Sequence, residues 1–415
     1  MSHPAHHVVV IVGGGAAGAT VASLLLKRRP DLDIAVVEPA ETHWYQPAWT
    51  LVGAGAFDVA ATGRPMASCL PGKVTWVRAR ASGFDPENNQ VLLEDGRRIE
   101  YRFLVAAAGL QLDWHKIEGL EATLGNNGVT SNYRHDLAPY TWECIRNFSG
   151  GQALFTQPPM PIKCAGAPQK ILYMAADHFR RRGLSAQLSF HTPGPAMFGV
   201  PFYSKALERV VAEYAIRPAY GQNLVAVDGP ARKATFEVKQ ADRSERIEQP
   251  FEMLHVVPPQ SAPDFIKSSP LADASGWVAV DKHSLRHARY DNVFGLGDCT
   301  TTPNSKTAAA VRAQAPVVTA NLLDALEGRE MSAKYDGYAS CPLTTSVGKI
   351  MLAEFLYDGV PAPSFPLDPR IPRRAYWWLK KSYLPALYWG MLRGNLGLDW
   401  HAPRQFPEAV PAFKA

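Results

Sequence analysis

The chain has 415 residues, enough for two or three domains with cores of their own. Its hydrophobic content of 47% and charged content of 20% are ordinary for a globular protein, and a net charge of +5 is too small to indicate nucleic acid as a partner. Five cysteines in this length exclude a disulfide scaffold, and their spacing does not match a zinc site, so we expect no metal.

The amino terminus is short before the first predicted strand, residues 8–12. Residues 1–7 leave no room for a signal or transit peptide, and no segment reaches the ~20 apolar residues of a spanning helix. We therefore expect a protein that is soluble or bound to one membrane face.

A glycine-rich turn follows the β-branched strand at residues 8–12 and precedes a helix predicted over residues 19–28. Gly13 permits the tight turn, Gly15 lets the backbone approach a pyrophosphate, and Gly18 lets helix and strand pack closely. This pattern predicts a dinucleotide site.

The next predicted strand, residues 34–37, ends at Glu38, whose carboxylate can accept hydrogen bonds from both ribose hydroxyls. The first strand, the helix, the second strand and the acidic residue all occur at the spacing of a dinucleotide-binding motif. A glycine turn without a ligand is therefore the weaker alternative.

Two later segments favour FAD as the dinucleotide, because they resemble the second and third motifs of flavoproteins with two dinucleotide domains. Residues 103–109 form a predicted strand ending at Gly109, after a hairpin that turns at residues 94–96. A second strand ends at Gly297-Asp298, where Asp298 would bind the ribityl chain.

A helix is predicted to start at Lys306-Thr307, with its positive end toward the flavin. The charge of Lys306 would stabilise a reduced, anionic flavin, although a surface lysine at a helix start is the alternative.

A second glycine fingerprint, as an NAD site requires, is missing from the middle of the chain. The predicted strand at residues 153–156 leads into Gln157-Pro-Pro-Met-Pro161, and proline cannot donate an N–H to phosphate. Cys164 occupies this loop, before a helix predicted from Ala167. We therefore expect reducing equivalents to enter through sulfur.

Cys164 and Cys341 are each framed by proline and small residues, which suit tight loops. A thiol pair with a flavin indicates electrons moving from sulfur to an isoalloxazine ring. Lys163 and Lys170 could lower the pKa of the Cys164 thiol, and solvated loop lysines are an equal alternative. The remaining cysteines are expected to be structural: Cys69, Cys144 and Cys299.

The composition changes from Arg370 onward. Aromatic residues there alternate with basic ones, and the only acid in residues 370–404 is Asp399. Such a segment favours the headgroup layer of an anionic membrane, with Pro385 separating or kinking two amphipathic helices. Helices packed on the protein's own core, or a dimer contact, are the alternatives. The basic residues counted are Arg370, Arg373, Arg374, Lys380, Lys381, Arg393 and Arg404.

Taken together, these segments resemble the sulfide:quinone oxidoreductase family, within the group that includes the mitochondrial enzyme, over nearly the whole chain. The most specific pieces are residues 45–55, 161–170, 295–300, 305–311 and 334–343. The resemblance implies an α/β fold with two Rossmann-like dinucleotide-binding domains, the second vestigial, and a C-terminal membrane-associated helical region.

The domains implied are an FAD-binding domain of residues 1–112 and 280–335, a nucleotide-domain-like unit of residues 113–279 with Cys164, and a C-terminal region of residues 336–415 with Cys341. FAD would be held noncovalently by residues that we expect to include Gly13, Gly15, Gly18, Glu38, Gln46, Ala81, Gly109, Gly297, Asp298, Lys306 and Thr307.

The resemblance also implies a reaction. Cys164 and Cys341 are joined at rest by a disulfide or through an extra sulfur, sulfide leaves a persulfide on Cys341, and the Cys164 thiolate attacks the flavin C4a position. A thiol, sulfite or sulfide then accepts the sulfur, and a quinone, with Phe355 and Tyr357 lining its pocket, accepts the electrons. We expect a peripheral protein of a membrane, the bacterial inner membrane, with a homodimer as one option.

Three other classes stay open on the sequence. They are a flavocytochrome-type sulfide dehydrogenase, a type II NADH:quinone oxidoreductase, and a flavin-binding sensor or sulfur-trafficking protein without turnover.

Overall fold

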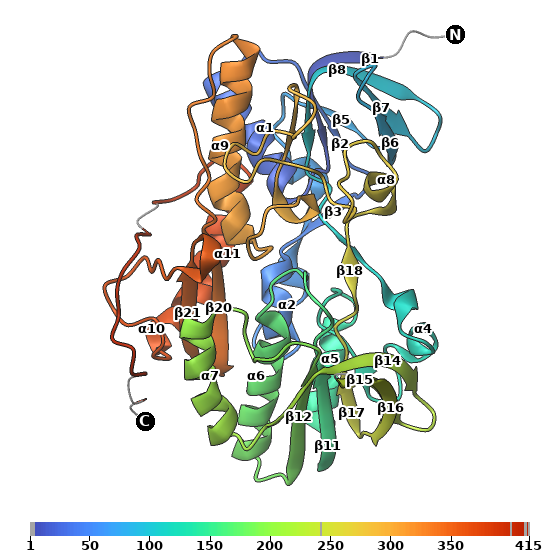
Figure 1. Ribbon diagram of the computed structural model, residues 1–415, viewed down its shortest axis with the longest axis vertical. Coiled ribbons are helices and arrows are strands. Elements are labelled where there is room, and N and C mark those ends of the chain that lie inside the picture. Colours follow the sequence, from blue (N-terminus) through green and yellow to red (C-terminus); the bar gives the residue numbers. More distant parts are fainter. Residues whose placement is uncertain (1–4, 241–242, 399–400, 411–412, 414–415) are drawn as a thin grey trace.

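The computed structural model describes residues 5–240, 243–398, 401–410 and 413 (Figure 1). The β-branched run near the amino terminus forms the centre of a mixed sheet, where both of its neighbours are parallel to it. This first sheet has the order β5-β2-β1-β8-β7-β6, with β19 beside β8. Its strands are β1 (Ala5–Val12), β2 (Ile34–Val37), β5 (Thr75–Val77), β6 (Ala81–Asp85), β7 (Gln90–Leu93), β8 (Arg98–Ala106) and β19 (Val293–Gly295).

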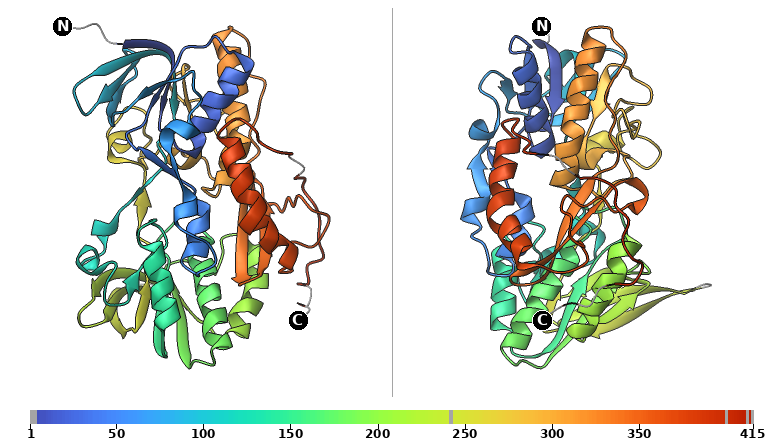
Figure 2. Two further views of the ribbon diagram at one scale, coloured as in Figure 1. Left: turned by 180° about the vertical axis from the view of Figure 1, so that it is seen from behind. Right: turned by 90° about the vertical axis from the view of Figure 1, so that its left-hand side faces the viewer.

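Helices α1 (Ala16–Arg28) and α9 (Ala308–Leu326) lie side by side against this sheet (Figures 1 and 2). The predicted hairpin between β7 and β8 is confirmed, as is the predicted strand β2. Because β19 and α9 come from late in the sequence, the first sheet is built from two distant parts of the chain. The domain bounds given above stay a prediction.

The second sheet is all parallel in its order β10-β17-β11-β12-β13, as expected for a Rossmann-like unit. The strands are β10 (Val129–Thr130), β11 (Gly151–Thr156), β12 (Ala186–Thr192), β13 (Arg217–Tyr220) and β17 (Met253–His255), and the helices are α5 (Ala138–Asn147), α6 (Ala167–Arg181) and α7 (Pro201–Glu213). The helix predicted from Ala167 is therefore confirmed.

Smaller elements join and extend the two sheets. Strands β9 (Gln111–Leu112) and β18 (Gln260–Ser261) pair between the two halves (Figure 1). An antiparallel sheet lies beyond the second sheet, with β14 (Gln222–Asp228), β15 (Lys233–Gln240) and β16 (Arg243–Pro250). The remaining short elements are β3 (Thr42–Trp44), β4 (Gly63–Pro65), α2 (Trp49–Val52), α3 (Met66–Cys69), α4 (Leu120–Thr123) and α8 (Asp264–Lys267).

The C-terminal part begins with the hairpin β20 (Ala339–Ser346) and β21 (Lys349–Phe355), and β20 packs against α6. A helical run follows, made of α10 (Arg374–Trp378), a π-helical turn (Leu379–Tyr383) and α11 (Leu384–Met391). Figure 2 shows this run along one side of the molecule.

Pro385 lies in the first turn of α11, where a missing backbone N–H is well tolerated. The π-helical turn Leu379–Tyr383 separates α11 from α10, and the backbone stays helical at Tyr383 and Leu384. A kink at Pro385 stays a prediction. None of the helices in the described ranges is long and apolar enough to cross a bilayer. Asp399 lies outside the described residues.

Candidate active site

The thiols of Cys164 and Cys341 come from segments 177 residues apart, yet their Sγ atoms lie 3.7 Å from each other. Cys164 lies in the loop between β11 and α6, and Cys341 lies on β20, which packs on that helix. Both are free thiols here, since a disulfide would need about 2.05 Å. The structure thus brings the two predicted cysteines together.

Gly166 makes this approach possible. A Cβ atom at this position would lie 2.6 Å from the Cys341 sulfur and 2.4 Å from Cδ2 of Leu343, closer than real contacts allow. Cys164 itself has a left-handed backbone (φ 49°), and its carbonyl accepts a hydrogen bond of 2.7 Å from the Ala167 N–H. The loop therefore turns tightly and presents its sulfur to β20.

A buried lysine accompanies the pair. The Lys170 ammonium donates a hydrogen bond of 3.1 Å to the Cys164 sulfur and is 2% exposed, so the alternative of a solvated lysine is wrong for this residue. The hydrogen bond from Cys341 and the charge of Lys170 hold the pKa of Cys164 well below the usual range of a thiol. The same hydrogen bond and burial raise the pKa of Cys341. Cys164 is therefore the thiolate of the pair.

Lys163 connects this loop to the first domain. Its ammonium donates a hydrogen bond of 2.7 Å to Oε1 of Gln46 and lies over the ring of Trp49. Burial lowers the pKa of Lys163 to about 8. Its backbone N–H donates 2.8 Å to the side chain of Gln260. Sequence reasoning missed Gln260 and the neighbouring Tyr133, whose hydroxyl donates to the Lys163 carbonyl, because no local pattern marks them.

The cysteine loop is also tied to the predicted flavin segment. The Cys164 N–H donates a hydrogen bond of 2.8 Å to the carbonyl of Lys306. The Lys306 ammonium in turn donates a hydrogen bond of 3.0 Å to the Thr300 carbonyl and lies over the ring of Trp277. Lys306 is only 6% exposed, so it is not a surface lysine. Thr307 caps α9 by accepting from the Ala310 N–H.

The glycine turn at the start of α1 has the form that a dinucleotide needs. Gly13 has φ 106°, and a Cβ at Gly18 would lie 1.8 Å from the Gly13 carbonyl oxygen. A Cβ at Gly15 would meet no described atom within 4 Å, which leaves open space where a pyrophosphate would lie. The Glu38 carboxylate accepts a hydrogen bond of 2.8 Å from the Gly14 N–H, at the edge of this space.

Asp298 suits a hydroxyl-bearing ligand. Its side chain is half-buried, no described residue hydrogen-bonds to its carboxylate, and burial raises its pKa. A carboxylate in such a place needs a donor, which the ribityl chain of FAD would supply. Gly297 has φ 76° and Gly109 has φ 70°, so both turns need glycine, whereas the Ala81 methyl group packs inside the first sheet. The residues present therefore fit FAD.

Phe355 and Tyr357 have different aromatic neighbours. The Phe355 ring packs with Phe198 and Tyr203, and the Tyr357 ring packs with Tyr335, while its hydroxyl donates to the Lys282 carbonyl. Their shared quinone pocket stays a prediction.

The other cysteines differ from the pair. Burial raises the pKa of Cys144 and of Cys299 to about 11, and burial also raises that of Cys69.

Two of the basic residues assigned to a membrane surface point inward instead. Arg370 is 1% exposed and forms a two-point ion pair with Asp368. Lys380 is 5% exposed, and burial and the nearby charge of Lys170 lower its pKa to about 7. A sequence pattern of alternating aromatic and basic residues does not tell which lysine of an adjacent pair faces the interior.

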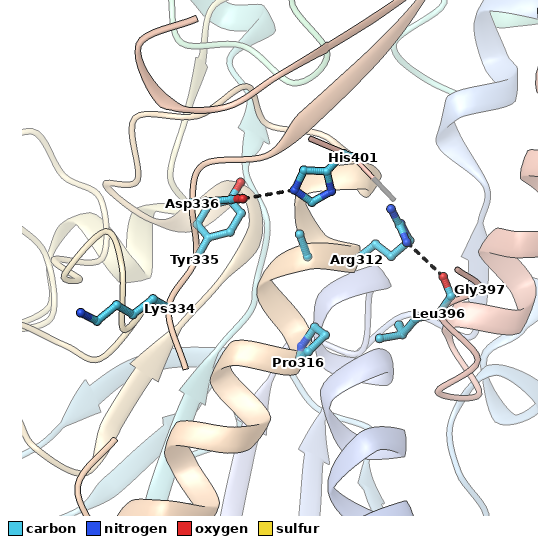
Figure 3. Close-up of a pocket in the computed structure, with 9 residues that line it drawn as sticks. Arg312, Pro316, Lys334, Tyr335, Asp336, Leu396, Gly397 and His401 are labelled. Atoms are coloured by element: carbon cyan, nitrogen blue, oxygen red, sulfur yellow. Dashed lines mark hydrogen bonds and ion pairs between the residues drawn. The ribbon is translucent and has the colours of Figure 1, made fainter. Parts of the chain in front are cut away.

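A separate pocket of about 270 Å³ lies beside α9, away from the thiols (Figure 3). His401 contacts Asp336 at 3.1 Å there, and Arg312 donates 3.2 Å to the Leu396 carbonyl. The bond from Arg312 fastens the tail after α11 to α9, and the His401 contact holds it to the segment before β20.

No family model matches the chain. The mitochondrial sulfide:quinone oxidoreductase of Dictyostelium discoideum is 44% identical over 368 residues, covering 88% of this chain and 80% of that protein. The mitochondrial sulfide:quinone oxidoreductase of Mus musculus is 42% identical over 376 residues, 90% of this chain and 83% of that protein. The chain belongs to the sulfide:quinone oxidoreductase family.

The sulfide:quinone oxidoreductase of Aquifex aeolicus, a solved structure, has the same fold with a TM-score of 0.75 at 21% identity, over 94% of this chain and 92% of that one. The predicted α/β fold and family are thereby confirmed, as is the prediction of an FAD-dependent oxidoreductase. The open alternatives of a flavocytochrome-type dehydrogenase, an NADH dehydrogenase and a sensor are set aside by this family membership.

Proposed function

We propose that Cys164 and Cys341 are the redox pair through which this enzyme oxidises sulfide and passes the electrons to quinone. The observation that carries the proposal is the 3.7 Å approach of the two sulfurs beside the buried Lys170. The hydrogen bond from Cys164 to the Lys306 carbonyl supports it, because it places the thiolate next to the segment that would hold the flavin.

The reaction begins with the pair as a disulfide. Hydrosulfide attacks the Cys341 sulfur, so that a new S–S bond forms there and the bond to Cys164 breaks. Cys341 then carries a persulfide, and Cys164 leaves as a thiolate whose charge Lys170 stabilises.

A thiol, sulfite or sulfide next takes the outer sulfur from Cys341. Closing the bridge again releases two electrons from the pair of thiolates. Bound FAD would supply the acceptor for these two electrons and their route to quinone. Gly15 and Glu38 would hold its pyrophosphate and ribose, and Asp298 its ribityl chain.

The C-terminal helical run supports a peripheral place on a membrane surface. Its inner face packs on the first domain, where Tyr388 and His43 share a hydrogen bond of 2.7 Å and Ser23 donates to the Leu392 carbonyl. Its outer face exposes Trp378 (64%) and Tyr383 (44%) next to basic residues. Aromatic and basic side chains together favour the headgroup layer, from which quinone would reach the flavin. The bacterial inner membrane and a homodimer stay predictions.

Anaerobic titration with sulfide while recording the flavin spectrum tests the proposal. We expect bleaching by sulfide, recovery on adding quinone, and no bleaching by NADH. Cys164→Ser and Cys341→Ser should each abolish bleaching with FAD still bound, whereas Cys144→Ser should behave as the wild type. Full sulfide–quinone turnover in either of the first two variants would refute the assignment of the pair.

A further inference from the structure

Lys380 lies on the buried stripe of the C-terminal helical run. Tyr376, Lys380 and Tyr388 follow at helical spacing and are 5%, 5% and 7% exposed. The adjacent Lys381 is exposed, so the chain places one lysine inside and its neighbour outside. Lys380 belongs to the π-helical turn Leu379–Tyr383, a local form that is frequent at functional sites.

The Lys380 ammonium has no hydrogen bond or ion pair within the described part of the chain. Lysine is almost never buried without a partner, because an unpaired ammonium loses its hydration. Helix α10, which leads into this turn, packs on β21, and β21 pairs with β20 so that Ala353 lies opposite Cys341. The packing brings the helical run to the strand pair that carries Cys341, and the charges that act on the Lys380 ammonium are those of Lys170, Cys164 and Cys341. A buried cation in this place that lacks a partner indicates a missing anion.

The two buried lysines differ in what they already bind. Lys170 is engaged with the Cys164 sulfur at 3.1 Å, and Lys380 is not engaged. In the reaction proposed above, a second negative charge comes with the substrate, first on hydrosulfide and then on the persulfide of Cys341. Lys170 stabilises the enzyme's own Cys164 thiolate, which leaves Lys380 for the anionic sulfur of the substrate.

We propose that Lys380 binds the substrate-derived sulfur anion beside Cys341. The proposal rests on the function proposed above and adds to it a residue from the membrane-facing helical run. Substrate binding and the surface helix then share one element, because Lys380 and the exposed Trp378 are only two residues apart on it.

Charge-selective alkylation of the reduced holoenzyme tests this assignment without turnover. Iodoacetate is an anion and iodoacetamide is its neutral counterpart, so the ratio of their rates at the Cys164 thiolate reports positive charge near the sulfurs. Below pH 7 the Lys380 amine, with a pKa of about 7, is charged. Mass spectrometry of the Cys164 peptide gives the rates.

We expect Lys380→Met to lower this ratio by roughly tenfold and to raise the KM for sulfide by a similar factor, as a lost charge contact predicts. Lys380→Arg should keep the rate ratio and the KM for sulfide close to their wild-type values, and Lys381→Met should match the wild type in both measurements. If the methionine variant does not fold, Lys380→Gln, checked by melting temperature and FAD content, gives the same comparison.

An unchanged ratio in the neutral variants would overturn the proposal, as would a lowered ratio with an unchanged KM for sulfide. Failure of the proposed function looks different, because Cys164→Ser or Cys341→Ser would then retain turnover while the wild-type alkylation ratio stayed high.

Discussion

The Lys170 ammonium donates a hydrogen bond of 3.1 Å to the Cys164 sulfur, and both groups lie at the amino-terminal end of α6. The positive charge and the helix dipole act in the same direction, because each favours a negative sulfur. The chain thus prepares one thiol of a coupled pair as the thiolate and leaves the other, Cys341, protonated at neutral pH.

Lys170→Met should raise the apparent pKa of Cys164. In the wild type, alkylation of Cys164 by iodoacetamide should fall only at low pH, as the thiolate is protonated through its lowered pKa. In the variant the fall should begin at higher pH. At pH values below the pKa of Cys164 in both proteins, the rate in the variant should be lower by roughly tenfold for each pH unit of that displacement. Lys205→Met, an exposed lysine on α7, is the control. Overlapping pH profiles would contradict the role of Lys170.

Gly166→Ala should separate the two thiols. The added methyl group would collide with Leu343 and with the Cys341 sulfur, so we expect destabilisation of about 1–3 kcal/mol and slow formation of the Cys164–Cys341 disulfide. Thermal unfolding and mass spectrometry after mild oxidation measure these effects. Gly199→Ala, where a Cβ meets no described atom within 4 Å, should change neither. A normal disulfide in the Gly166 variant would show that β20 can move aside.

Much of this site follows from local sequence. The glycine turn at Gly13, the start of α6 after Cys164 and the strand before Asp298 are each specified by residues within a few positions, and all were predicted. The pairing of Cys164 with Cys341 came from resemblance, because no spacing rule connects residues so far apart.

What could not be predicted is decided by packing between distant segments. The sequence alone is also compatible with Lys306 as an exposed lysine at a helix start. In the structure its ammonium is buried between the ring of Trp277 and the Thr300 carbonyl. Lys380 and Lys381 are identical in sequence terms, and only the surface against which the helical run packs decides that Lys380 turns inward.

Gly15 and Gly18, at the start of α1, allow the requirements of folding and of FAD binding to be tested separately. A Cβ at Gly18 would overlap the Gly13 carbonyl, so Gly18→Ala should lower the melting temperature even without cofactor. A Cβ at Gly15 meets only open space, so Gly15→Ala should fold normally and bind FAD at least about tenfold more weakly. Melting curves of the apoprotein and fluorescence titration with FAD distinguish the two. Normal FAD affinity in the Gly15 variant would place the pyrophosphate elsewhere.

Exposed aromatic residues on the C-terminal run provide the test of membrane binding. Removing everything from Arg370 would also remove Tyr388 and its hydrogen bond to His43, so point variants are the cleaner experiment. Trp378→Ala with Tyr383→Ala should weaken binding to anionic vesicles by at least about tenfold, because two large apolar surfaces no longer enter the headgroup layer.

The matched control is Tyr220→Ala, which removes an aromatic residue of similar exposure (41%) from β13. Sedimentation with vesicles measures binding, and added salt should weaken it because basic residues contribute. The double variant should lose reduction of a long-chain quinone held in vesicles but retain reduction of a short-chain quinone in solution. Equal binding by the double variant and the wild type would instead support a dimer contact at this exposed face.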